Sequence, residues 1–352
     1  MKKSKANLRQ KILSDRTIRR AITQQSHYWF FHIFLTHYVK HETALFQREM
    51  FQLTEDETYK MIAVMAFRGS AKSTIMNLSY AIWSVLGRQQ KKFVFIISKT
   101  QNQAKAHFQN IKYELEHNEL LKNDLGPFTA DSDQWGMHSL EIHKLGAKIT
   151  CVSREQSIRG MRHGPRRPDL LICDDIEDSL SVQTSQERDL TFRWFSTEVV
   201  PMIDSGARII ILGNLLHERS FMMSMADRIT KGTLPGIFRA YPLIDDLGQI
   251  LWPGKFPTTE AIKALYDTIT DRATLQQEYL LRFFSGLNDA IPFIIFDESP
   301  SEEGRNRWKN GIKQYPQRSL GKYRISAPVV LFTTKVMGKT EHDRFQKWLR
   351  GF

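Results

Sequence analysis

The chain has 352 residues, with 50 Lys and Arg against 38 Asp and Glu, and a formal net charge of +12 at pH 7. This positive excess favours a polyanionic partner that is bound through its backbone. Two cysteines, Cys151 and Cys173, lie in separate apolar runs, which predicts core thiols and excludes a disulfide framework. No apolar run reaches the roughly 18 residues that a membrane span needs, so we expect no membrane partner.

The N-terminal part divides into a basic segment and an aromatic one. Eight of the first twenty residues are Lys or Arg, and we expect residues 1–24 to form a basic arm that contacts DNA or a partner protein. The alternative is a solvated, frayed terminus. Residues 28–39 are rich in aromatic side chains, but two histidines and no small-residue cleavage site argue against a signal sequence. They predict a helix packed on the core.

Residues 61–75 read as an apolar strand, a loop of small residues, Lys-Ser-Thr and a helix, the layout of a phosphate-binding loop. Backbone N–H groups and the helix N-terminus hold phosphates in such loops. Lys72 is expected to reach the β- and γ-phosphates of a nucleoside triphosphate, and the Ser73 hydroxyl to complete a Mg²⁺ shell. The expected ligand-binding residues of the loop are Gly69, Ser70, Ala71, Lys72, Ser73 and Thr74.

The loop deviates from the pattern G-x-x-x-x-G-K-[ST], because Ala66 and Ala71 occupy the two glycine positions. Alanine resists positive φ by about 1–2 kcal/mol. The alternative interpretation is an ordinary helix start. The flanks favour the phosphate loop: apolar residues recur at helical spacing up to Gly87, and residues 91–98 and 100–117 predict a strand and a helix. This alternation is typical of a doubly wound α/β fold.

Residues 169–178 form a second motif, in which four apolar residues precede paired carboxylates, as in a Walker B strand. The carboxyl end of such a strand delivers its acids to the ligand crevice of an α/β sheet. Asp174 is expected to hold Mg²⁺, directly or through water, and Asp175 to orient and deprotonate an attacking water. Glu177 is the alternative base. A solvated acidic turn is the structural alternative.

A third apolar strand is expected at residues 208–213, followed by small and polar residues. In an NTPase this position senses the γ-phosphate, and Asn214 and His217 are the candidates. An ordinary strand with a capped loop is the alternative. The three segments together predict an α/β P-loop NTPase with a mainly parallel twisted sheet between helices, followed by a short irregular tail.

These motifs, in this order, resemble the ATPase part of a tailed-phage terminase large subunit. The likeness covers residues 25–284 and rests on segments 67–74, 157–160, 166–175, 211–214 and 277–280. It implies a DNA-dependent ATPase that uses ATP and Mg²⁺ to move double-stranded DNA into a procapsid in the host bacterial cytoplasm. The implied partners are the terminase small subunit and the portal protein, on which the subunits form a homo-oligomeric ring.

The resemblance also assigns roles to single residues. Arg68 corresponds to a cis-acting arginine that stabilises transition-state charge, and Asn214 lies in the coupling motif. Gln47 is the candidate for adenine contacts, and a surface helical glutamine is its alternative. Arg159 is a second charge stabiliser, a DNA contact or simply a solvated arginine.

Residues 285–352 are too few for the nuclease domain that the family usually carries, since domains usually run to about 100–150 residues. Their acids cluster in a Pro- and Ser-bearing segment, so we expect no nuclease activity from this chain alone. A separate nuclease polypeptide is then a further partner. Two other functions remain as alternatives: a helicase-like nucleic-acid-dependent ATPase, and a degenerate terminase remnant that binds DNA or a partner without turnover.

Overall fold

The computed structural model describes residues 14–128, 135–269 and 271–283, and its centre is a seven-stranded sheet. The strand order is β3-β4-β2-β5-β6-β1-β7, and every neighbouring pair is parallel except β3 with β4. The strands are β1 (Met61–Ala66), β2 (Phe93–Ser98), β3 (Ser139–Ile142), β4 (Ala147–Ser153), β5 (Leu170–Asp174), β6 (Arg208–Gly213) and β7 (Ile237–Tyr241). The predicted mainly parallel α/β fold is confirmed.

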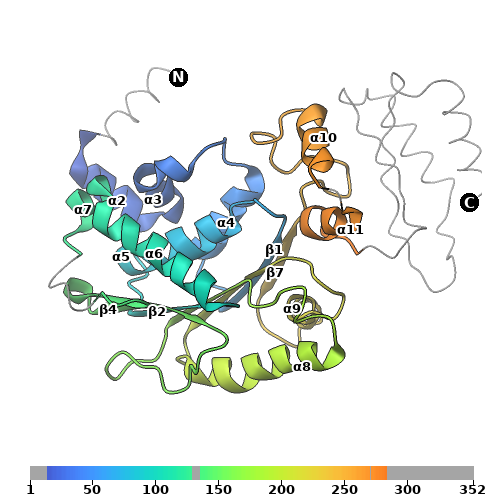
Figure 1. Ribbon diagram of the computed structural model, residues 1–352. Coiled ribbons are helices and arrows are strands. Elements are labelled where there is room, and N and C mark those ends of the chain that lie inside the picture. The colour runs from blue at the N-terminus through green and yellow to red at the C-terminus, as the bar shows by residue number, and fades with distance from the viewer. Residues whose placement is uncertain (1–13, 129–134, 270, 284–352) are drawn as a thin grey trace, which may run out of the picture.

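Helices cover both faces of the sheet (Figure 1). One face carries α2 (Arg16–Gln25), α3 (His27–Phe34), α4 (Leu45–Glu55), α5 (Tyr80–Leu86), α6 (Gln101–His117) and α7 (Glu119–Leu125). The opposite face carries α8 (Ser185–Trp194) and α9 (Phe221–Thr230), and α10 (Thr259–Asp267) and α11 (Arg272–Thr274) lie beyond β7. Each face has its own hydrophobic cluster, so β1, β2, β5 and β6 are buried on both sides. This burial accounts for their uninterrupted apolar sequences.

Short helical segments connect these elements. Among the described residues, η1 (Thr36–Tyr38), η4 (His143–Leu145) and η6 (Val200–Met202) are 3₁₀ turns. The segments η2 (Thr74–Ser79), η5 (Phe195–Val199) and η7 (Leu275–Tyr279) have π geometry. The helix expected after Ser73 therefore begins as a π segment, continues as α5 and ends at Gly87. π segments are frequent at functional sites.

The aromatic segment and the cysteines lie as expected. Phe30, Phe31 and Phe34 of α3 are buried in the core, although the helix ends before residue 39. Cys151 and Cys173 are both buried free thiols. In the part of the chain that the structure describes, no helix is both long enough and apolar enough to cross a bilayer.

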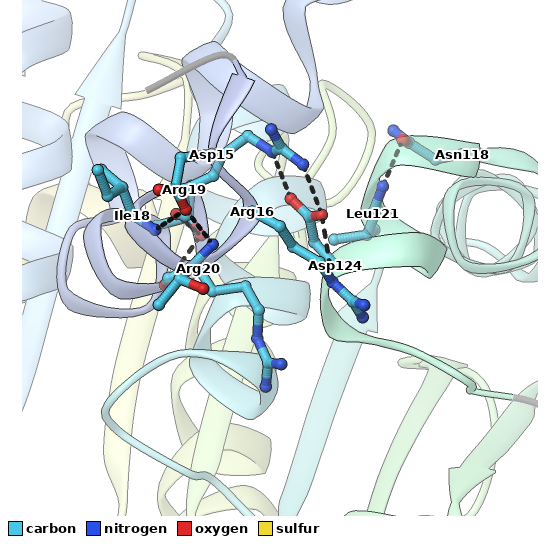
Figure 2. Close-up of polar contacts among 10 residues, drawn as sticks. Asp15, Arg16, Ile18, Arg19, Arg20, Asn118, Leu121 and Asp124 are labelled. Carbon is cyan, nitrogen blue, oxygen red and sulfur yellow. Dashed lines mark hydrogen bonds and ion pairs between the residues drawn. The ribbon is translucent and has the colours of Figure 1, made fainter. Parts of the chain in front are cut away.

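A buried ion pair anchors the N-terminal helix (Figure 2). Arg19 of α2 donates from Nε and Nη2 to the carboxylate of Asp124 in α7, at 2.5 and 2.8 Å. Both side chains are almost fully buried, whereas Arg16 lies 3.8 Å from the same carboxylate and is exposed. The last part of the expected basic arm is therefore a packed helix. Residues 1–13 and the tail beyond residue 283 lie outside the described residues.

Candidate nucleotide site at the carboxyl edge of the sheet

The predicted motifs follow three adjacent parallel strands. β5, β6 and β1 are neighbours in the sheet, so their carboxyl ends lie at one edge. Lys72 follows β1, Asp175 follows β5 and Asn214 follows β6. Segments more than 100 residues apart in the chain thus meet where ligands bind in open α/β sheets.

The loop after β1 is held in a compact turn. The Phe67 N–H donates to the Tyr241 carbonyl, and the Ser70 N–H donates back to the Phe67 carbonyl. Gly69 has φ of +78° and Ala71 has φ of +70°. Ala71 therefore adopts the left-handed conformation for which the motif has glycine, at a cost of about 1–2 kcal/mol. Ala66 is the last residue of β1 and needs no such conformation.

Lys72 is the centre of the site. Its side chain is only 9% exposed, and its ammonium donates to Asn214 Oδ1 at 2.8 Å. The same nitrogen lies 3.6 Å from Asp175 Oδ1. Residues from all three predicted motifs are thus in contact, with the positive charge fixed between an amide and a carboxylate.

Asp174 is buried and oriented by two donors. It accepts from Ser73 Oγ at 3.1 Å and from Asn77 Nδ2 at 2.9 Å, and His107 Nε2 of α6 lies 3.6 Å from its carboxylate. Sequence reasoning did not anticipate Asn77 or His107. One signal was available for Asn77, because it is a polar residue four positions after Ser73 on the same helical run, and residues at that spacing lie on one face.

Asp175 and Glu177 differ in position. Asp175 is half-buried beside Lys72 and has φ of +48°, an uncommon conformation that often marks functional sites. Burial raises the pKa of the Asp175 carboxyl, against the opposing charge of Lys72. Glu177 instead accepts from the N–H groups of Phe221 and Met222 at the start of α9, and burial raises the pKa of its carboxyl as well. Of these two carboxylates, Asp175 is the one that lies beside Lys72.

Arg68 belongs to the loop after β1, and Gln47 contacts the same loop from α4. The Arg68 guanidinium donates to Glu278 Oε2 at 2.6 Å, and its backbone N–H donates to the Glu278 carbonyl. This pairing raises the pKa of Arg68. Gln47 is buried, not a surface residue: Nε2 donates to the Ser70 carbonyl at 2.9 Å. It lines a cavity of about 30 Å³ together with Ala71 and Trp252.

The remaining candidates lie elsewhere or lack a contact in the site. His217 Nδ1 accepts from the Arg219 N–H, and burial lowers the pKa of its imidazole. Arg159 is exposed and pairs with Glu198 at 3.3 Å. Thr74 begins η2 and is half-buried. The structure therefore does not bring His217 or Arg159 into contact with the residues around Lys72.

The donor set fits a magnesium nucleotide. Within the described ranges no group of three or more His, Cys, Asp or Glu side chains is arranged to hold a metal ion. Mg²⁺ needs no such group, because it binds through one or two carboxylates, phosphate oxygens and water. Ser73 and Asp174 provide adjacent oxygens for it. Ser70 Oγ and Asn77 Oδ1 are buried without a hydrogen-bond partner, which leaves two polar groups for a ligand or its water.

The fold and this edge define the class of protein: an α/β, P-loop-like fold with a compact loop of small residues after β1. No family model and no curated protein matches the chain.

Among solved structures, the chain is similar to phage large terminases. It matches the large terminase of bacteriophage HK97 with a TM-score of 0.48 and 14% identity, over 68% of this chain and 50% of that one. For a large terminase from a thermophilic bacteriophage, the values are 0.42 and 12%, over 63% and 48%. For the ATPase domain of a Thermus phage large terminase, they are 0.43 and 15%, over 66% and 92%. The chain thus spans about half the length of the first two.

Proposed function

We propose that this chain is the ATP-hydrolysing motor of a phage DNA packaging machine, a terminase large subunit. The observation that carries the proposal is the meeting of Lys72, Asp175 and Asn214 at the carboxyl edge of the sheet. A buried ammonium beside a compact loop of small residues is suited to bind a polyphosphate. The carboxylates beside this ammonium are suited to bind a metal ion and to orient water. The order of the motifs resembles that in terminases, and this resemblance implies that the substrate moved by ATP hydrolysis is double-stranded DNA.

Each residue has a distinct task in this proposal. Lys72 and the loop N–H groups bind the β- and γ-phosphates, while Ser73 and Asp174 hold Mg²⁺, which neutralises phosphate charge when bound. Asp175 accepts the proton of the attacking water, because its carboxyl is half-buried and has a raised pKa. Glu177 lies in the loop after β5 and accepts from the Phe221 N–H at the start of α9, so it holds that loop against the helix.

We infer that two contacts change when the γ-phosphate binds. Asn214 holds the Lys72 ammonium, and Glu278 holds the Arg68 guanidinium. Phosphate oxygens compete for both cations, so binding loosens Lys72 from the loop after β6 and Arg68 from η7. Arg68 then stabilises transition-state charge. Movement of these two segments is the proposed link between hydrolysis and DNA translocation.

DNA binding is assigned to the segment between β4 and β5, which we call the arginine loop (residues 154–168). It contains five arginines, of which four are exposed: Arg159, Arg162, Arg166 and Arg167. The fifth, Arg154, is held over the Trp194 ring at 5.2 Å. Such a surface suits phosphate contacts with little sequence preference.

The further partners in this proposal are the terminase small subunit, the portal protein and a separate nuclease polypeptide. The chain acts as a homo-oligomeric ring on the portal, in the host bacterial cytoplasm. These assignments rest on the resemblance of the motifs, and the segment that bears on the nuclease, residues 285–352, lies outside the described residues.

ATP turnover with and without linear double-stranded DNA tests the proposal. We expect DNA-stimulated hydrolysis by the wild type and none by Lys72→Ala. Nucleotide binding without any turnover would support the degenerate remnant instead. Unwinding of a duplex with a single-stranded tail would support a helicase-like ATPase, because a packaging motor moves intact duplex.

A salt series tests the DNA surface. Affinity for linear duplex should fall steeply between low and moderate salt, because phosphate contacts release counterions. The double variant Arg162→Ala/Arg166→Ala should reduce the salt slope by about one unit per lost phosphate contact. Lys231→Ala is the control, since Lys231 is paired with Asp227 on α9. An unchanged slope in the double variant would exclude the arginine loop as the DNA surface.

A further inference from the structure

A lysine outside all three motifs touches the phosphate loop. Lys255 lies between β7 and α10, and its ammonium donates to the Gly69 carbonyl at 2.9 Å. A Cβ on residue 69 would lie 3.0 Å from this nitrogen, so the lysine approaches the loop as closely as a glycine permits. The contact joins segments 186 positions apart.

Aromatic rings hold the lysine in this position. Its ammonium lies 5.1 Å from the ring centroid of Trp252 and 5.3 Å from that of Phe256. Trp252 is itself fixed, because its indole N–H donates to the Glu42 carbonyl. A long, flexible side chain is thus confined beside the loop, which lowers the entropy cost of using it for a ligand.

Lys255 differs from the other two cations at the loop in having no carboxylate partner among the described residues. Lys72 lies beside Asp175, and Arg68 is paired with Glu278. Lys255 forms no ion pair within the described ranges, and burial lowers the pKa of its ammonium without a carboxylate to raise it. A partly buried cation without a counter-ion is unfavourable until an anion arrives.

The position relative to the nucleotide site is also suitable. Trp252, which contacts Lys255, lines the same cavity as Gln47 and Ala71. Lys255 is thus linked to the loop directly through Gly69, and to the cavity through Trp252. An ammonium has three donors, and only one of them is used on Gly69.

We propose that Lys255 is a further nucleotide ligand, which keeps its bond to Gly69 and donates its remaining hydrogens to phosphate oxygens of the bound nucleotide. This inference rests on the proposed function. It also explains how the segment beyond β7 senses the ligand, because Lys255 and Glu278 contact the neighbouring loop residues Gly69 and Arg68. Nucleotide then ties that segment to the loop through Lys255.

The test is nucleotide affinity of Lys255→Met and Lys255→Arg in the full chain, measured by calorimetry with ATP, ADP, inorganic tripolyphosphate and adenosine. We expect Lys255→Met to weaken the two nucleotides and tripolyphosphate about tenfold or more, while adenosine binding is unchanged. Lys255→Arg should restore most of the loss. Lys263→Met, on the exposed side of α10, is the matched control and should change none of these affinities.

The outcomes separate this inference from the proposed function. If the wild type binds ATP and Lys255→Met binds it equally well, Lys255 is not a ligand, while the nucleotide site stands. Equal losses for ATP and adenosine would make Lys255 a strap that only shapes the site, and would also overturn the inference. If the wild type binds no nucleotide, both proposals fail. A thermal melt of each variant shows whether a loss of binding reflects unfolding.

Discussion

Lys72 Nζ donates to Asn214 Oδ1 at 2.8 Å and thereby joins the loop after β1 to the loop after β6. A lysine has a long, mobile side chain, and the amide fixes its end before any phosphate is bound. The same ammonium is close to Asp175, so one charge organises residues from three strands. Its removal leaves a half-buried carboxylate without its cation.

The nucleotide chemistry should therefore depend on Lys72 and Asp175 in different ways. Lys72→Ala should abolish ATP turnover and weaken ATP binding strongly, because the phosphates lose their charge partner. Asp175→Asn should bind ATP but not hydrolyse it, since an amide accepts no proton. Phosphate release and equilibrium binding measure the two effects. Lys60→Ala is the control, because Lys60 is exposed and its ammonium donates to the Gly206 carbonyl. Retained hydrolysis in Lys72→Ala would refute the phosphate-loop assignment.

Ala71→Gly should stabilise the protein. Ala71 has φ of +70°, where glycine avoids the strain of a Cβ, and we expect a gain of about 1 kcal/mol after the entropy cost of glycine. The melting temperature should rise by roughly 2–4 °C. Ala106 is an exposed residue within the length of α6, and Ala106→Gly should have the opposite effect and cost about 1 kcal/mol. A loss of stability in both variants would contradict the strain at Ala71.

The buried ion pair between α2 and α7 should contribute far more than its exposed neighbour. Arg19→Met leaves the Asp124 carboxylate buried without its bidentate partner, so we expect a loss of about 3–5 kcal/mol in the free energy of unfolding. Arg16→Met removes an exposed partner at 3.8 Å and should cost less than about 1 kcal/mol. Urea denaturation measures both. Equal effects would show that the two arginines share the charge of Asp124.

Glu177 should make stability depend on pH. Burial raises the pKa of its carboxyl in the folded state, so the folded protein binds more protons than the unfolded chain above the ordinary glutamate pKa of about 4.3. The contribution of Glu177 to the free energy of unfolding therefore falls as pH rises from about 4.3 through the folded pKa of this carboxyl, and it is constant at higher pH. Glu177→Gln lacks this dependence, so the variant gains relative to the wild type as pH rises.

Denaturant titrations of both proteins at several pH values measure that difference. Glu260→Gln supplies a control with the opposite sign, because the Thr258 hydroxyl lowers the pKa of Glu260. The contribution of Glu260 is lost as pH falls. A difference between Glu177→Gln and wild type that does not change with pH would show that the carboxyl titrates normally.

The strands and the main site could be predicted from sequence because their signals are local. Four apolar residues before Asp174 mark a strand end, and Lys72 follows a strand and a loop of small residues. Adjacent strands then bring these ends together without further information. The motif has glycine at both Ala66 and Ala71, and the sequence alone did not tell which of the two adopts positive φ; the structure shows that Ala71 does.

The contacts made by Lys255, Glu278 and His107 have no local signal in the sequence. Lys255 contacts Gly69, and Glu278 contacts Arg68, across 186 and 210 positions of the sequence. His107 approaches Asp174 from a helix whose pattern indicates only an amphipathic surface. Glu177 could not be separated from Asp175 by spacing, because the turn after β5, which directs one carboxylate toward Lys72 and the other toward α9, is a tertiary feature.

The position of β1 in the sheet has a consequence for biosynthesis. β1 begins at Met61, but the two described strands that pair with it, β6 and β7, begin at Arg208 and Ile237. By contrast, β2 finds its partners β4 and β5 by residue 174. A nascent chain can thus assemble the β4-β2-β5 part while β1 stays unpaired, with its apolar residues available to chaperones or to aggregation. Residue 241 must have left the ribosome before the loop after β1 can form its contact with Tyr241, so a ligand that needs this loop could assist only the last stage of folding.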